Sequence, residues 1–170
     1  NFQRNEQFLR NFMEKMIDWC FKQKKGIKIV EPNRRLSESY LTKADNALNS
    51  IECNKFKEWK LATAYYSMYF SVYAILTKIG IKCEIHNCTI EFTRRYLSEF
   101  LNESDIDLLH IALKSRIDEQ YYIDKEVNEE SFTLILENAP RFKDKCSEIL
   151  LKLNERKINQ LRQNLQKQAL

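Results

Sequence analysis

An arginine and a glutamine lie among apolar residues in a helical segment in the second half of the chain. In SRIDEQYYID, residues 115–124, the helical period places Arg116 and Gln120 on the same side as Leu109 and Leu113. An unpaired guanidinium on such a face costs on the order of a few kcal/mol, so Arg116 needs a carboxylate, carbonyl groups or a ligand phosphate. The sequence leaves two alternatives open: a salt bridge to an acidic residue of another helix or of a second copy, and a phosphate-binding or catalytic arginine.

Two groups of tyrosines can supply stacking surfaces. Tyr121 and Tyr122 follow Arg116 closely and are candidate contacts for a nucleotide or RNA. The run AYYSMYFSVY, residues 64–73, contains four more tyrosines. Tyrosine often fills a helical core with its hydroxyl group at the edge, so the sequence does not decide which of these rings are core and which line a surface.

One histidine stands beside cysteines, which raises the question of a metal site. In CEIHNC, His86 lies between Cys83 and Cys88, but no second pair with ligand spacing occurs, so we expect neither a metal nor a cofactor. His86 can instead cap a helix end, satisfy a buried carbonyl group or line a functional cleft. The chain has two histidines and lacks a Gly-rich phosphate loop, a nucleophile elbow and an H-E-x-x-H motif, so candidates for a general base are few.

Composition predicts the fold class of the elements that must position these residues. The 170 residues include two Gly and two Pro, which is little material for the turns of a β-sheet, and 44% are hydrophobic, enough for one core. We predict an all-α protein. Its longest apolar run, residues 64–76, is interrupted by two serines and is shorter than the roughly 20 residues of a transmembrane helix, so we expect no membrane association.

Periodicity and capping residues predict the helices. An extended stretch is expected in GIKIVEPN, residues 26–33, and Gly80 should end the central helix in the left-handed conformation. Expected caps are Asn87, Ser104 and Asn128, and Pro140 should kink the last helix. The predicted helices cover residues 2–21, 36–51, about 54–79, 88–101, 104 to about 122, and 128 to about 170.

The end of the chain is basic and the cysteines are scattered. Residues 141–170 carry eight Lys or Arg and three Asp or Glu, a net charge of +5, whereas the whole chain carries +4. This segment is either a solvated helix that packs on its own bundle or on a second copy, or a contact for nucleic acid. The five cysteines show no disulfide framework, so we expect a reduced, cytoplasmic protein.

Three stretches within residues 26–150 belong together: GIKIVEPNRRLSESYLTKADNAL, KEWKLATAYYSMYFSVYAILTKIGIKCEIH and RIDEQYY. Together they resemble the archaeal and bacterial HEPN domains. The resemblance implies an antiparallel bundle of four to five helices, here with an extra N-terminal helix in residues 1–25 and a basic helical extension in residues 151–170. It also implies a homodimer and a gene neighbour that encodes a minimal nucleotidyltransferase.

The resemblance also implies what the site residues do. Family ribonucleases carry an arginine followed four to six residues later by a histidine; Arg116 matches the arginine, but Tyr121 and Tyr122 stand in the place of the histidine. Tyrosine has a pKa of about 10 and is a poor general base at neutral pH. We therefore predict a nucleotide- or RNA-binding module without efficient metal-independent ribonuclease activity, which acts with a nucleotidyltransferase in a toxin–antitoxin-like or substrate-holding role. The alternatives are a ribonuclease that uses Arg116 with Tyr122 or His86, and a helical scaffold for self-association.

Overall fold

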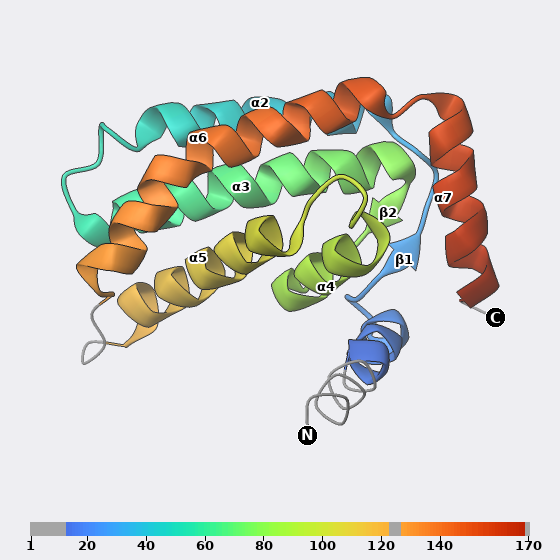
Figure 1. Ribbon diagram of the computed structural model, residues 1–170, viewed down its shortest axis with the longest axis horizontal. Helices are drawn as coiled ribbons and strands as arrows, with labels where there is room; N and C mark the ends of the chain where they lie inside the picture. The colour runs from blue at the N-terminus through green and yellow to red at the C-terminus, as the bar shows by residue number, and fades with distance from the viewer. Residues whose placement is uncertain (1–12, 123–126, 169–170) are drawn as a thin grey trace.

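A long, apolar helix runs through the centre of the molecule. The computed structural model describes residues 13–122 and 127–168, and in it α3 (Lys57–Ile79) is buried along most of its length, as its sequence predicts. It contacts α2 (Arg34–Ser50), α5 (Glu103–Tyr121) and α6 (Glu129–Lys152), with α2 and α6 along one side and α5 along another (Figure 1). The remaining helices are α4 (His86–Tyr96), α7 (Glu155–Gln168) and a helical stretch at residues 13–22. The predicted all-α class is confirmed.

A short antiparallel pair of strands closes one end of the bundle. β1 (Lys28–Ile29) pairs with β2 (Ile81–Lys82), with Ile29 opposite Ile81. The strand β2 directly follows Gly80, whose φ of 87° ends α3 in the left-handed conformation, as predicted. A side chain at Gly80 would also collide with the backbone of Val30 and Pro32, so the close approach of the two segments requires glycine here.

The fourth helix differs from its predicted limits. It begins at His86, with Ile85 as the N-cap and no side-chain cap, so the expected capping role of Asn87 is wrong. It ends at Tyr96, not at residue 101, because Leu97 leaves the helical conformation and its side chain is completely buried. Burial of Leu97 and Leu101 in the core therefore decides the course of the chain after α4.

The fifth helix begins at a different cap. Asn102, not Ser104, is the N-cap of α5: its side chain accepts a hydrogen bond from Asp105 N at 3.0 Å, and Asp105 Oδ2 accepts one from Asn102 N at 3.1 Å. This reciprocal arrangement is a capping box. It also turns the Asp105 carboxylate inward, where Arg141 and Lys145 of α6 pair with it.

The end of the chain forms two helices where one was predicted. Asn128 caps α6 as expected, and α6 runs through Pro140 and changes direction along its length (Figure 1). It ends at Lys152, and Asn154 accepts a hydrogen bond from Lys157 N at 3.0 Å as α7 begins. The break coincides with the burial of Leu153, and it lets α7 cross the end of the bundle.

The basic end of the chain packs on its own bundle. Arg162 Nη1 donates to the carbonyl oxygens of Val30 at 2.8 Å, Ile79 at 2.9 Å and Gly80 at 3.3 Å. Leu161 and Leu165 are buried. This segment therefore stabilises the β1–β2 end of the bundle. Arg162, one of its basic residues, makes hydrogen bonds within the protein.

A disulfide joins the N-terminal helical stretch to α4. Cys20 and Cys88 are bonded, with an S–S distance of 2.10 Å, and both are completely buried. The expectation that the cysteines are reduced is therefore wrong for this pair, whereas Cys53, Cys83 and Cys146 are free. Residues 68 positions apart meet in the core, a contact that spacing along the sequence does not reveal. The cytoplasmic location remains a prediction.

A search of residues 13–122 and 127–168 for a membrane span finds no helix with the necessary length and apolarity.

Candidate functional site

Arg116 lies in an aromatic setting on the inner side of α5. Its Nη1 donates to Tyr66 Oη at 3.3 Å and to Gln120 Oε1 at 3.1 Å, and its Cζ lies 5.4 Å from the ring centres of both Tyr65 and Tyr66. Its Nε is buried and makes no hydrogen bond. Within the described residues no carboxylate pairs with Arg116, so of the two alternatives the salt bridge to another helix is not found there. The partners of the guanidinium, Tyr66 and Gln120, are neutral, so its positive charge can attract an anionic ligand.

His86 reaches the same aromatic group from the start of α4. Its ring stacks on Tyr69 with the centres 4.3 Å apart, and its Nδ1 lies 2.5 Å from Tyr65 Oη. Burial, and to a lesser extent the charge of Arg116, lower the pKa of His86 below its usual value, so the ring is neutral at pH 7. Because Ile85 is the N-cap of α4, the expected capping role of His86 does not apply, and its Nδ1 meets a hydroxyl group and not a buried carbonyl group.

Tyr65 is the residue that joins Arg116 to His86. Its ring lies beneath the guanidinium, and its hydroxyl group meets the imidazole. Burial raises the pKa of Tyr65 far above its usual value, so the phenol keeps its proton and can donate it to Nδ1 of the neutral imidazole. A central helix residue thus brings together two candidates that lie 30 positions apart.

The question of the four tyrosines now has an answer. Tyr65, Tyr69 and Tyr73 are buried, and burial raises the pKa of each. Tyr66 is half-buried and is the one whose hydroxyl group accepts from Arg116. Sequence reasoning did not identify Tyr65 and Tyr66 as partners of Arg116; the unusual density of tyrosines was the signal that pointed to this region.

The aromatic surface continues from Tyr66 towards α2. Phe70 stacks on Tyr66 at 5.4 Å between ring centres and on Tyr40 at 6.0 Å, and all three rings are half-buried. Lys43 Nζ lies 5.4 Å from the centre of the Phe70 ring. We call this row, Tyr66, Phe70 and Tyr40, the aromatic row. Arg116 stands at its Tyr66 end, and Lys43 lies over both Phe70 and Tyr40.

Gln120, which bonds Arg116, also lines a pocket. Its volume is about 330 Å³, and its lining includes Trp59 and Tyr121, whose side chains are 50% and 70% exposed. Glu58 and Glu119 also line it. Gln120 thus accepts from Arg116 through its Oε1 and shares this pocket with two accessible rings. The pocket provides the stacking surface that the sequence suggested for Tyr121.

Tyr122 has a different position from Tyr121. It is the C-cap of α5, its N–H donates to Asp118 O at 3.1 Å, and its side chain is 46% exposed. Residues 123–126 lie outside the described residues. The structure thus groups Arg116, Gln120 and His86 around Tyr65 and Tyr66, places Tyr121 beyond Gln120, and leaves Tyr122 at the helix end.

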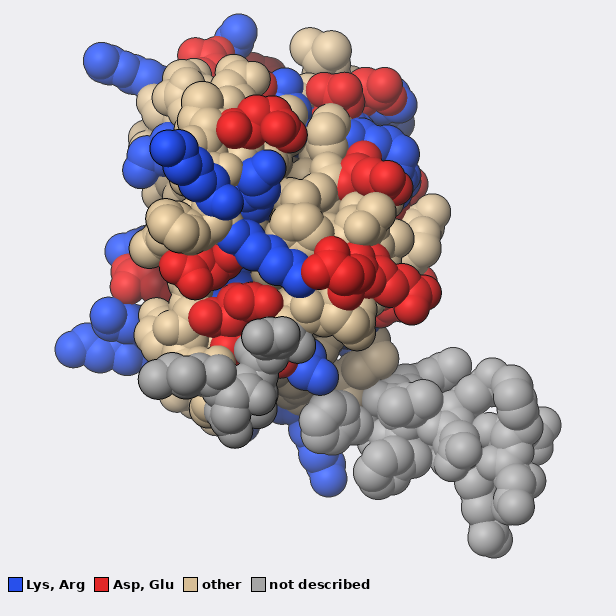
Figure 2. Space-filling view, turned by 90° about the vertical axis from the view of Figure 1, so that its left-hand side faces the viewer, with Lys and Arg blue, Asp and Glu red and all other residues tan. Residues whose placement is uncertain are grey.

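The end of the bundle near this pocket carries mixed charge. Figure 2 shows Lys and Arg interspersed with Asp and Glu on the face where α3 begins and α5 ends, without one large area of a single sign. An extended basic surface would attract any polyanion through long-range forces. Here an anion can be recognised by the local arrangement of Arg116 and its neighbours.

The cysteines beside His86 are not arranged for a metal. Cys88 is bonded to Cys20, so its sulfur is not a thiolate ligand, and burial raises the pKa of the Cys83 thiol. In the part of the chain that the structure describes, no three His, Cys, Asp or Glu residues are grouped to hold a metal ion.

The pH dependence of stability should report on His86. Its folded-state pKa is lowered, so as the pH falls below about 6.5 the unfolded chain binds a proton that the folded protein resists, and the free energy of unfolding decreases. His86→Gln should remove this part of the decrease, which urea unfolding between pH 7.5 and 5 measures. His110→Gln, at an exposed position on α5, is the control and should retain it. Equal pH profiles for wild type and His86→Gln would contradict the assignment.

Comparison with protein-family models and with curated proteins finds no match to this chain.

Proposed function

We propose that this protein is a HEPN-type module that binds a nucleotide or RNA through Arg116. The observation that carries the proposal is a half-buried guanidinium with no carboxylate partner among the described residues, held between tyrosine rings and a glutamine. Such a cation favours an anion that can accept its remaining N–H groups, and phosphate matches the guanidinium in geometry. The rings supply the surfaces on which bases stack.

The phosphate and the base occupy different parts of the proposed site. A phosphate lies against Arg116, because Glu58 and Glu119 in the neighbouring pocket repel anions. A base lies between Trp59 and Tyr121, whose rings are accessible, or along the aromatic row. Gln120 stands between the two parts and can hydrogen-bond either of them.

A homodimer and a nucleotidyltransferase partner complete the proposal, in a toxin–antitoxin-like or substrate-holding role. Both come from the resemblance to HEPN domains. The aromatic row supports a second copy in one respect: its rings are half-buried, and an apolar surface of this kind gains from further burial. Sedimentation of the pure protein measures the oligomeric state directly.

One observation favours a second candidate function, a ribonuclease. His86 shares Tyr65 with Arg116, so an imidazole that is neutral at pH 7 stands near the proposed phosphate site. A neutral imidazole can act as a general base on a ribose hydroxyl group, while the arginine stabilises phosphate charge. The lowered pKa makes it a weaker base than an ordinary histidine, and its Nδ1 is already engaged by Tyr65.

Titration of labelled single-stranded RNA tests the proposal. Binding is followed by fluorescence anisotropy at two salt concentrations, and cleavage is followed on gels from the same samples. Arg116→Ala should weaken binding by about tenfold or more, because a charge-assisted contact to phosphate is lost. Lys114→Ala, which removes an exposed cation of the same helix, is the matched control and should change binding by about twofold or less.

The outcomes separate the candidates. Arginine-dependent binding that weakens with salt, without cleavage, supports the binding module. Cleavage that both Arg116→Ala and His86→Ala abolish replaces it with the ribonuclease. Absence of RNA binding, or an equal loss of RNA affinity in Arg116→Ala and Lys114→Ala, contradicts phosphate recognition by Arg116. The remaining hypothesis is then a helical scaffold for self-association.

A further inference from the structure

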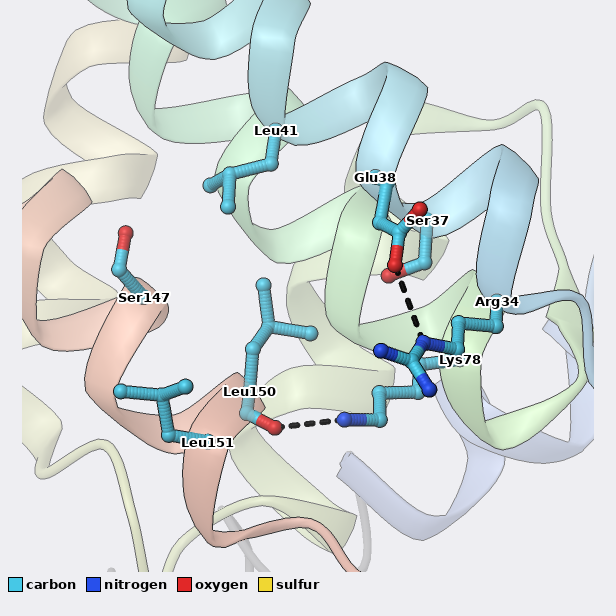
Figure 3. Close-up of a pocket in the computed structure, with 8 residues that line it drawn as sticks. All are labelled: Arg34, Ser37, Glu38, Leu41, Lys78, Ser147, Leu150 and Leu151. Atoms are coloured by element: carbon cyan, nitrogen blue, oxygen red, sulfur yellow. Dashed lines mark hydrogen bonds and ion pairs between the residues drawn. The ribbon is translucent and has the colours of Figure 1, made fainter.

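A second pocket lies on a different face of the bundle, where α2, the end of α3 and the end of α6 meet. Figure 3 shows the side chains that surround it, and its volume is about 270 Å³. α5, which carries Arg116, contributes no residue to its lining. Lys78 of this pocket lies 12 positions after Tyr66 on α3, about 18 Å along the helix axis. The pocket is therefore separate from the site around Arg116.

Two cations stand at one end of the pocket. Lys78 Nζ donates to the carbonyl oxygen of Leu150 at 2.6 Å, and Arg34 Nε pairs with Glu38 Oε1 at 3.0 Å (Figure 3). An ammonium has three N–H donors and a guanidinium has five, so both retain donors beyond these contacts. Burial, and then the charge of Arg34, lower the pKa of Lys78. Both cations line the same end of the pocket and repel each other (Figure 3). Glu38 offsets part of this repulsion, and an anion between the two cations would relieve the rest.

The opposite side of the pocket is apolar except for Ser147, whose hydroxyl group donates to Lys143 O at 3.1 Å. Leu41 of α2 and Leu150 of α6 point into it, and Leu151 stands at its edge with a side chain that is 86% exposed (Figure 3). A leucine exposed to this extent gains from covering by an apolar ligand, at about 25 cal/mol for each Å² removed from water. Ser37 also lines the pocket, but its hydroxyl group donates to Ala74 O at 2.7 Å and serves the packing of α2 on α3.

We propose that this pocket binds a small hydrophobic monocarboxylate, with the carboxylate between Lys78 and Arg34 and the hydrocarbon part against the three leucines. The charges favour a single negative charge, because two cations face one carboxylate, Glu38. The volume favours a short chain. Among the described residues, none that lines the pocket is aromatic, so a nucleotide base would find no stacking surface there. This site is independent of the proposed binding of RNA.

Calorimetric titration with octanoate, octanol and octylammonium tests the proposal, because the three ligands share one hydrocarbon chain and differ in the charge of the head group. Octanoate should bind saturably at one site per chain. Octanol lacks the charge and octylammonium has the wrong sign, so both should bind at least about tenfold more weakly. Lysine NMR provides a second readout: the carboxylate should raise the pKa of Lys78 on binding, because it stabilises the ammonium form.

Two variants and two matched controls locate the site. Arg34→Gln and Leu151→Asp change exposed side chains at the two ends of the pocket, so the fold should be retained, and each should weaken octanoate binding by about tenfold. Arg35→Gln on α2 and Leu134→Asp on α6 change exposed residues of the same helices that do not line the pocket, and should leave binding within about twofold. Octanol that binds as tightly as octanoate, or unchanged binding by Arg34→Gln, overturns the proposal.

Discussion

Reduction of the disulfide between Cys20 and Cys88 is expected to lower the free energy of unfolding by about 4 kcal/mol. The bond links residues 68 positions apart, and closing a loop of that length removes much of the conformational freedom of the unfolded chain. It ties the helical residues 13–22 to α4, whose first residue is His86. The bond therefore stabilises the attachment of the N-terminal segment to the bundle as well as the fold as a whole.

Urea unfolding with and without a phosphine reductant measures this effect. The double variant Cys20→Ala/Cys88→Ala is the control, because its stability should not respond to the reductant. Thiol titration in denaturant provides an independent count: the oxidised protein should expose three thiols, Cys53, Cys83 and Cys146, of the five cysteines in the chain. Five reactive thiols before reduction would show that the bond is absent.

Asp105→Ala should lower the free energy of unfolding by about 3 kcal/mol. The carboxylate is completely buried and has three partners: Asn102 N in the capping box, and the side chains of Arg141 and Lys145 on α6. Alanine at this position removes the acceptor for Asn102 N. It also removes the ion pairs of α5 with Arg141 and Lys145. Those cations are partly exposed, at 56% and 30%, so water compensates part of the loss and the effect stays below that of a fully buried pair.

The matched control is Asp107→Ala, two residues further along α5. Its carboxylate is 63% exposed and pairs with Arg94 at 3.5 Å, an arrangement typical of a contribution below about 1 kcal/mol. Chemical unfolding followed by circular dichroism at pH 7 compares the two variants. If Asp107→Ala were as destabilising as Asp105→Ala, the buried network between α5 and α6 would have no special part in stability.

Local rules predicted the features that depend on neighbouring residues. The scarcity of Gly and Pro predicted the helical class, Gly80 ends α3 as expected, and Asn128 caps α6. The helical period also placed Arg116 and Gln120 on an inner face, where both are half-buried. These features depend on composition or on residues within a few turns of one helix, both of which the sequence displays directly.

The same local rules failed where a distant contact decided the outcome. Asn102 and Ser104 are both good N-caps, and the inward position of Asp105 against α6 accompanies the use of Asn102. The sequence predicted one helix from Asn128 towards residue 170, although its apolar stripe shifts in register between Leu153 and Ile158; the helix breaks there, after Lys152, where Leu153 is buried. Local propensity is weak compared with burial of a large side chain, so packing prevails at such positions.

The sequence by itself determined the types of element and the residues with chemical potential: a helical chain, an arginine on an inner face, tyrosines and a histidine. The tertiary structure decided which of them meet. Tyr65 contacts both His86 and Arg116, and Cys20 is bonded to Cys88. Lys78 and Arg34 line the same pocket, which also contains three leucines. The physical reason is that these partners lie on different helices, whose relative positions depend on how all the apolar faces pack together.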